Sequence, residues 1–268
     1  MKAFHQTISI LTGLFLLAGT IGAGAGVYDA WSFRTKLRFA GYDKAGTLTN
    51  FPALVVLQTN LTGFSYSDFT SPTNGADLRF SASNATTALN YEIQEWNTNG
   101  SSYLWVQVPT IASSNDYVYA YWGYDTNAAP CTTNGATWTN DYQGVWHLDE
   151  TVGNALDSTS NRFSGAVTVS ARGVTGKIAS GYQFSGAGNF VNINMTLGPT
   201  VTISTWASKA AGAEMLWVVR GDNPGPDLWF PADGNIYLNT WDSYNNPFTA
   251  QINHCVGCTK VNTYIVSD

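Results

Sequence analysis

The feature that most constrains the fold of this chain is a succession of short segments in which apolar and polar residues alternate. The segment 31–39 (WSFRTKLRF) alternates in this way, and ADLRFSA, NYEIQEWN, YLWVQVP and DYVYAYWG follow it, separated by turn-forming stretches such as SPTNGA and NTNGSS. A period of two residues is typical of β-strands that bury one face. We find no long amphipathic helix in the sequence. The pattern therefore predicts an all-β protein built from β-sandwiches of the jelly-roll kind.

The composition is that of many extracellular β proteins. Hydrophobic residues make up 44% of the 268 residues, which is enough to bury a core, whereas only 11% of the residues are charged. That charged fraction is well below the usual quarter of a globular domain. The 12 basic and 18 acidic residues leave a net charge of −6, and there is no basic run. Nucleic acid is therefore not an expected partner.

Residues 1–25 are predicted to be a signal peptide. Lys2 precedes the apolar run ISILTGLFLLAG, and AGA at 23–25 matches a cleavage site with small residues. The apolar run has about a dozen residues, short of the roughly 20 that span a bilayer, and no later segment could span one. We therefore expect cleavage after Ala25 and a mature chain that is exported, either extracellular or at the cell surface.

The three cysteines, Cys131, Cys255 and Cys258, do not identify a site by themselves. An odd number in an exported chain leaves at least one without a partner inside the chain. The CVGC motif at 255–258 lacks the further ligands of a zinc site and the helix that follows a redox pair. A local disulfide is one interpretation, and the absence of a special role is the other.

The first strand-rich region resembles a known family. WSFRTKL, FPALVVL, GADLRFS, YEIQEWN, LWVQVP and YVYAYWG occur in order over residues 31–124, as in the family called domain of unknown function 2341. The family has no established activity, so the resemblance implies a domain at residues 26–125 and no chemistry. The polar stretch at 126–143 is the predicted linker.

Residues 144–268 are similar to the concanavalin A-like lectin/glucanase superfamily, in its laminin G-like jelly-roll branch. The residues that carry this resemblance are the first strand GVWHLDE, then DSTSN with Gly165, GKIASGYQFSG with FVNI, and VTISTWA. The resemblance implies a β-sandwich that binds glycans or partner proteins, often with a calcium ion. Strands that the branch usually carries after GNIYLNTW are not found, so we expect this domain to be truncated at its C-terminal end.

Aromatic residues that alternate along strands are candidate sugar-binding positions. Trp105, Tyr119 and Tyr121 form one candidate platform, and Trp229 with Trp241 forms another. Sugars stack on aromatic faces through their C–H groups. The alternative is that these rings belong to the core of the sandwich, as aromatic side chains usually do.

Oxygen-bearing side chains gather after the strand GVWHLDE. Asp149, Glu150, Asp157 and Asn161, with Ser160 beside them, lie within a short span. Such hard oxygen ligands are the ones that Ca²⁺ prefers. The same residues could instead form polar turns in which Asp157 and Asn161 bond to their own backbone.

A glycoside hydrolase is the alternative to a binding protein. It needs two carboxylates that flank one bond, roughly 5–5.5 Å or 6.5–9.5 Å apart. Glu92 and Glu95 face apart on a strand, and so do the neighbours Asp149 and Glu150. We therefore predict a non-catalytic protein that recognises a polysaccharide or glycoprotein. A structural surface spacer without a ligand is the third possibility.

Overall fold

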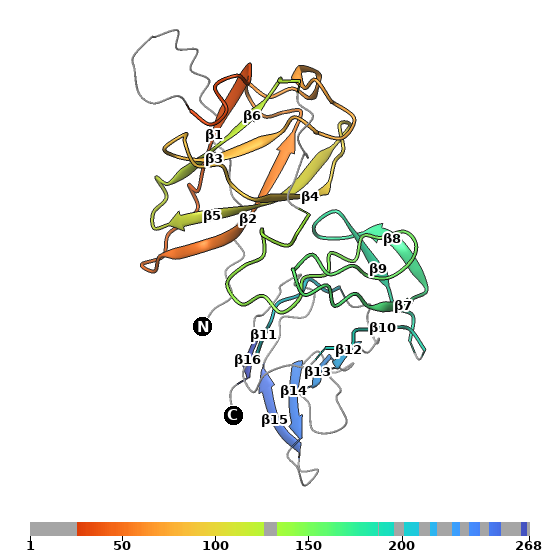
Figure 1. Cartoon of the computed structure of the whole chain (residues 1–268). Helices are drawn as coiled ribbons and strands as arrows, with labels where there is room; N and C mark the ends of the chain where they lie inside the picture. Colours follow the sequence, from red (N-terminus) through yellow and green to blue (C-terminus); the bar gives the residue numbers. More distant parts are fainter. Residues whose placement is uncertain are drawn as a thin grey trace. The chain divides into compact units, whose positions relative to one another are not determined.

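The computed structural model describes residues 26–125, 133–186, 188–195 and 201–208, and beyond them the five strands β12 to β16 (Figure 1). The signal peptide predicted at 1–25 and the three cysteines lie outside the described residues. The predicted all-β class is confirmed, because the described part consists of antiparallel sheets and one short 3-10 helix, Tyr66–Asp68. Within that part, no helix is long and apolar enough to cross a membrane.

The chain divides into two compact units. The first unit contains the described residues up to Ala166 together with Ala171–Tyr182, and the second contains Val167–Ser170 and the described residues from Gln183 onward. The second unit pairs β7 (Ala166–Thr168) with β10 (Phe190–Asn192) and β11 (Val201–Ile203) with β16 (Tyr264–Val266). Its four-stranded antiparallel sheet follows sequence order: β12 (Met215–Val218), β13 (Asp227–Phe230), β14 (Ile236–Trp241) and β15 (Pro247–Ile252).

Two three-stranded antiparallel sheets form a sandwich in the first unit (Figure 1). One sheet has the order β1-β6-β3, with β1 at Phe33–Arg38, β6 at Tyr117–Trp122 and β3 at Arg79–Ala82. The other has the order β2-β5-β4, with β2 at Leu48–Gln58, β5 at Ser101–Ile111 and β4 at Tyr91–Glu95. Buried residues of both sheets belong to one hydrophobic core.

The alternation read from the sequence decides which side chains enter this core. On β5, Leu104 and Val106 are fully buried, whereas Trp105 between them points to the outer face. On β6, Val118 and Ala120 are buried in the same core. Each large apolar side chain removed from water stabilises the fold by about 1.5–3 kcal/mol. Because both inner faces meet at one core, the outer faces of the two sheets point in opposite directions.

A buried carboxylate holds the loops at one end of the sandwich. Asp77 is 1% exposed, and its carboxylate accepts hydrogen bonds from the backbone N–H groups of Thr70 (3.1 Å), Ser71 (3.1 Å) and Gly123 (2.7 Å). Burial by itself would raise the pKa of Asp77, but these N–H donors outweigh burial and hold the pKa below its ordinary value. Asp77 is therefore an ionised anchor for the loops before β3 and after β6.

The segment 133–166 belongs to the first unit, although most of it is not in strands. Thr137 and Trp138, which lie within the predicted linker, are buried. The first unit thus continues past that linker. The predicted domain limits, 26–125 and 144–268, stay a prediction. The predicted strand GVWHLDE is reduced to one bridge between Trp146 and Asp157. Leu148 has a φ of 61°, which interrupts an extended strand.

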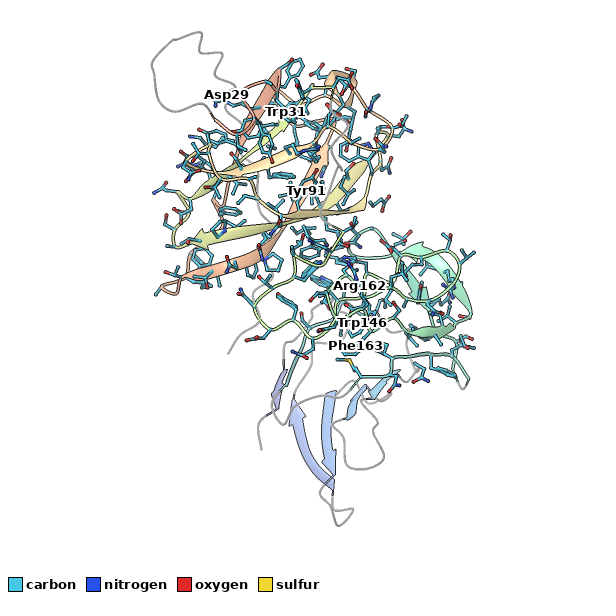
Figure 2. All side chains as sticks on the ribbon, in the orientation of Figure 1. Asp29, Trp31, Tyr91, Trp146, Arg162 and Phe163 are labelled. Carbon is cyan, nitrogen blue, oxygen red and sulfur yellow. The ribbon has the colours of Figure 1, made fainter. Side chains whose placement is uncertain are left out.

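Two further contacts hold this segment together. The indole N–H of Trp146 donates to the backbone oxygen of Phe163 at 2.8 Å, and Arg162 donates to the backbone oxygen of Asp157 at 3.1 Å (Figure 2). The hairpin of β8 (Ala171–Thr175) and β9 (Ser180–Gln183) follows. Loops that carry buried polar partners in this way can hold a defined shape without regular strands.

Candidate functional site

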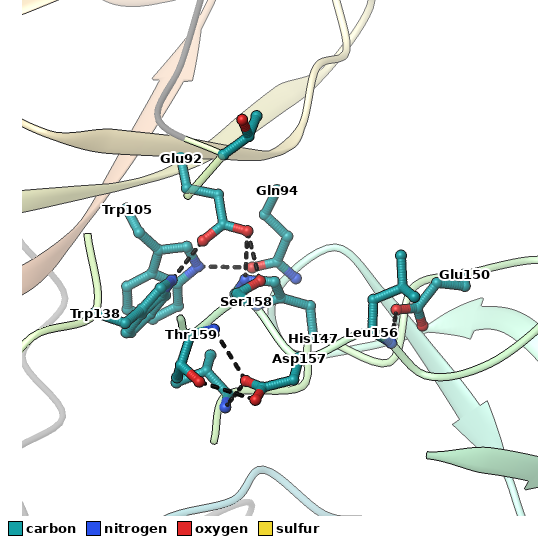
Figure 3. A network of polar contacts seen from close by, with 12 residues as sticks. Glu92, Gln94, Trp105, Trp138, His147, Glu150, Leu156, Asp157, Ser158 and Thr159 are labelled. Atoms are coloured by element: carbon teal, nitrogen blue, oxygen red, sulfur yellow. Dashed lines mark hydrogen bonds and ion pairs between the residues drawn. The ribbon is translucent and has the colours of Figure 1, made fainter. Parts of the chain in front are cut away.

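Glu92 on β4 joins the outer face of the sheet β2-β5-β4 to the segment 133–166 (Figure 3). Its Oε1 accepts a hydrogen bond from the hydroxyl of Ser158 at 2.6 Å and lies 3.5 Å from Nε2 of His147. Its Oε2 accepts a hydrogen bond from the indole N–H of Trp138. One carboxylate therefore ties three side chains of the segment to the sheet.

The electrostatics of this cluster favour a structural role for Glu92. Burial by itself would raise its pKa, but the His147 imidazole 3.5 Å away, followed by the donors Ser158 and Trp138, outweighs burial and lowers the pKa. Burial raises the pKa of Asp149, and the neighbouring Glu150 adds to the increase. Opposite shifts of two carboxylates are also found at acid–base sites. Both oxygens of Glu92 accept hydrogen bonds from the segment 133–166, as a carboxylate that holds this segment to the sheet would.

Trp105 lies beneath this cluster and not on an open surface. Its ring centroid is 5.1 Å from that of Trp138 and 6.1 Å from that of His147, whose ring is nearly parallel to it. Its indole N–H donates to Oε1 of Gln94 at 2.8 Å. The segment 133–166 therefore covers Trp105.

The predicted platform of Trp105, Tyr119 and Tyr121 is not formed. Trp105 lies on β5, whereas both tyrosines lie on β6, which belongs to the other sheet. Because outward-facing residues of the two sheets point in opposite directions, these rings cannot contact one flat ligand together. The other candidate pair lies on β13 (Trp229) and β14 (Trp241), whose side chains are outside the described residues.

Asp157 is surrounded by hydrogen-bond donors. It is 1% exposed; its Oδ1 accepts from the N–H groups of Val145 and Thr159, both at 2.9 Å. Its Oδ2 accepts from the Thr159 hydroxyl and the Phe163 N–H, both at 2.8 Å. This is the arrangement of the polar-turn alternative, in which the carboxylate satisfies the loop backbone.

The other predicted calcium ligands do not converge with Asp157 on one position. Glu150 accepts from the N–H of Leu156 at 2.6 Å and from the hydroxyl of Tyr182 at 2.7 Å. Asn161 donates to the backbone oxygen of Gln143 at 3.0 Å. Asp149 is half-buried beside Glu150. Among the described residues, no group of three or more His, Cys, Asp or Glu side chains is placed to hold a metal ion. The calcium ion stays a prediction.

An open cavity of about 450 Å³ lies in the segment that was expected to be a linker. Volumes of this size are typical of small-molecule sites. The polar side chains that line it are those of Asn134, Thr139, Asp141, Gln143, Ser160 and Asn161, and its aromatic side chains are Trp138 and Tyr142. Trp138 is buried, whereas Tyr142 is 37% exposed, and their rings meet edge to face with centroids 5.5 Å apart. The cavity thus offers one exposed ring among amides and hydroxyls.

The walls of the cavity depend on a close approach of two loops. Gly135 has a φ of 86°, and a Cβ atom there would overlap the backbone nitrogen of Ser160. Only glycine fits such a position. On the neighbouring loop, the Asn140 amide donates to the backbone oxygens of Thr49 and Asn50, which ties the cavity segment to β2.

The sequence did not predict this cavity, because most of its residues were assigned to a linker and the others, Ser160 and Asn161, to a calcium site. The signal that could have revealed it is the pair of aromatic residues, Trp138 and Tyr142, within a stretch of small polar residues. Exposed linkers rarely contain large apolar side chains, because those side chains gain stability only when they pack.

The comparisons with known proteins find one family. No curated protein and no solved structure was found to match the chain. The comparisons give no support for a concanavalin A-like domain at residues 144–268, and that resemblance stays a prediction. Residues 74–163 match the model of the family described as Domain of unknown function (DUF2341). The match confirms the predicted resemblance to this family over β3 to β6 and extends it beyond residue 124, through the segment that contains the cavity.

Proposed function

We propose that this protein is a non-catalytic carbohydrate-binding protein and that neutral sugar residues bind in the open cavity. The observation that carries the proposal is the exposed ring of Tyr142 among amide and hydroxyl side chains. Sugars offer C–H groups that pack on aromatic rings and hydroxyls that pair with amides in both donor and acceptor roles. Asp141, an exposed carboxylate of the cavity, adds a strong acceptor for a pair of sugar hydroxyls.

Two sequence-based expectations support the same ligand class. The predicted signal peptide at 1–25 would place the protein outside the cell, where polysaccharides and glycoproteins are the partners at hand. The similarity of residues 144–268 to laminin G-like jelly rolls implies glycan or protein binding, in which Trp229 and Trp241 would take part and calcium would order the loops. We include export, the role of Trp229 and Trp241 and the calcium ion in the proposal.

The hydrolase alternative depends on Glu92 and Asp149, whose pKa values shift in opposite directions. Neither residue lines the open cavity. Loss of glycan cleavage in Asp149→Asn, with glycan binding retained, would favour the enzyme over the binding protein. Intact glycans after long incubation with the wild-type protein would favour binding alone.

The binding proposal is tested by titrating neutral oligosaccharides into the protein and its Tyr142→Ala variant in a calorimeter. Tyr124→Ala is the matched control, because Tyr124 is 39% exposed and does not line the cavity. We expect Tyr142→Ala to weaken binding about tenfold, the effect of losing roughly 1.4 kcal/mol of stacking. Tyr124→Ala should bind like the wild type. Equal affinity in Tyr142→Ala and the wild type, or no binding of any neutral glycan, would contradict the proposal.

A further inference from the structure

The outer face of the sheet β1-β6-β3 carries a row of cations beside a row of tyrosines. In the antiparallel register of β1 and β6, Arg34 is opposite Tyr121, Lys36 opposite Tyr119, and Arg38 opposite Tyr117. The six residues alternate with Leu37, Val118 and Ala120, which enter the core, so their side chains lie on the other side of the sheet. Tyr121 is buried there at 3% exposure, whereas the other five are partly or fully exposed. We call this set the tyrosine–cation face.

Two of the three cations contact aromatic rings, and the third binds a side-chain amide. The Lys36 ammonium lies 4.0 Å from the centroid of the Tyr117 ring, and the Arg34 guanidinium lies 5.1 Å from that of Tyr119. Arg38 donates to the amide oxygen of Asn115 at 2.8 Å. The ion pairs found among the described residues include none of these three cations.

This grouping is unusual for an acidic chain. The whole protein has only 12 basic residues against 18 acidic ones, yet three basic residues alternate along a single strand. Like charges on one face of a strand repel each other, and the tyrosine rings give Arg34 and Lys36 only about 0.5–1 kcal/mol each at an exposed site. A ligand with regularly spaced negative charges would relieve the repulsion.

We propose that the tyrosine–cation face binds an extended acidic polysaccharide. Its carboxylate or sulfate groups pair with Arg34, Lys36 and Arg38, and its sugar rings pack on Tyr117 and Tyr119. A nucleic acid also presents regularly spaced anions, so binding of a nucleic acid more tightly than either acidic polysaccharide would overturn the proposal. An acidic peptide would instead add a strand along the edge of β1 through its backbone, without need of a row of rings. This binding is independent of the neutral-sugar cavity.

The experiment measures the affinity of the purified protein for polygalacturonate, a carboxylated polymer, and for dextran sulfate, a sulfated one. Neutral dextran and poly-L-glutamate are measured beside them. We expect an acidic polysaccharide to bind more tightly than both, with an affinity that falls as salt is added. The better of the two acidic polymers identifies the anionic group.

The decisive variant is Arg34→Gln/Lys36→Gln, with Lys44→Gln/Lys177→Gln as a control that removes the same net charge elsewhere in the first unit. We expect the first pair to weaken binding roughly tenfold, as the loss of two exposed ion pairs implies, and the control pair to leave it unchanged. Tyr142→Ala should also bind the acidic polymer normally. Equal weakening of binding by both double variants would show that binding depends on the net charge alone. Binding of poly-L-glutamate as tight as that of the polysaccharides would show recognition of a peptide or of any polyanion. Either result, or no binding of either acidic polysaccharide, overturns the proposal.

Discussion

Replacing Asp157 by asparagine separates a carboxylate that serves the loop backbone from one that binds calcium. Asparagine keeps the size and shape of the side chain but turns one acceptor oxygen into an NH₂ donor. Each oxygen of Asp157 accepts two hydrogen bonds, from Val145 and Thr159 at Oδ1 and from Thr159 and Phe163 at Oδ2. Whichever oxygen is replaced, two donors lose their acceptor inside a buried site.

The size of the effect follows from these contacts. Hydrogen bonds to charged groups contribute about 1.5–3 kcal/mol each. The Thr159 hydroxyl can rotate to accept from the new NH₂ group, which recovers part of the loss. We therefore expect Asp157→Asn to reduce the free energy of unfolding by about 3 kcal/mol. In a domain of this size, that loss lowers Tm by about 10 °C.

The assay is thermal and urea unfolding of the wild type and Asp157→Asn, each with and without millimolar calcium. Asp141→Asn is the control, because Asp141 is exposed and should change stability by less than about 0.5 kcal/mol. We expect Asp157→Asn to lose the same stability with and without calcium. An Asp157→Asn variant as stable as the wild type would refute it. If calcium stabilises the wild type but not Asp157→Asn, Asp157 is a calcium ligand.

Further predictions concern a buried anion and a glycine. Because the folded pKa of Asp77 lies below its ordinary value of 3.8, its ionisation stabilises the protein fully above that pH, and this stabilisation is lost as the pH falls through the lowered pKa. From pH 6 to pH 2, the free energy of unfolding should therefore fall less steeply in Asp77→Asn than in the wild type. Parallel curves of the free energy of unfolding against pH would contradict this. Gly135→Ala should destabilise the protein by more than about 2 kcal/mol and weaken glycan binding, since both backbone strain and overlap with Ser160 oppose it. Gly153→Ala, at a φ of 76° with nothing within 4 Å of its Cβ, should cost only about 1 kcal/mol in chemical denaturation, and equal losses at the two glycines would refute the close approach.

The strands of the sandwich were predictable because each is encoded locally. The alternation in WSFRTKLRF, YLWVQVP and DYVYAYWG appears in the structure as β1, β5 and β6. The run FPALVVLQT is apolar at nearly every position, a pattern that predicts a strand buried on both faces. In β2, Ala53, Val55 and Leu57 are buried and the residues between them are only partly covered. An apolar run alone does not reveal how well the outer face of a sheet is covered.

The segment after the sandwich was predicted less well, because its conformation depends on distant partners. GVWHLDE was expected to be a strand, but His147 and Trp146 instead contact residues far away in the sequence, Glu92 and Phe163. Trp138 packs on Trp105 and donates to Glu92, so the polar stretch around it is part of the fold. Alternation and turn residues carry no information about such contacts.

The sequence alone therefore determined the all-β class, the main strands of the sandwich and which residues of each strand face outward, because strand periodicity is a local property of the chain. It also identified the outward tyrosines of β6. Only the tertiary structure decided that Trp105 and Tyr119 lie on opposite outer faces, that Asp157 is surrounded by backbone donors, and that Tyr142 stands in a cavity. These depend on which strands pair and which loops approach each other, and that is settled by burial and hydrogen bonding between segments that are far apart in the sequence.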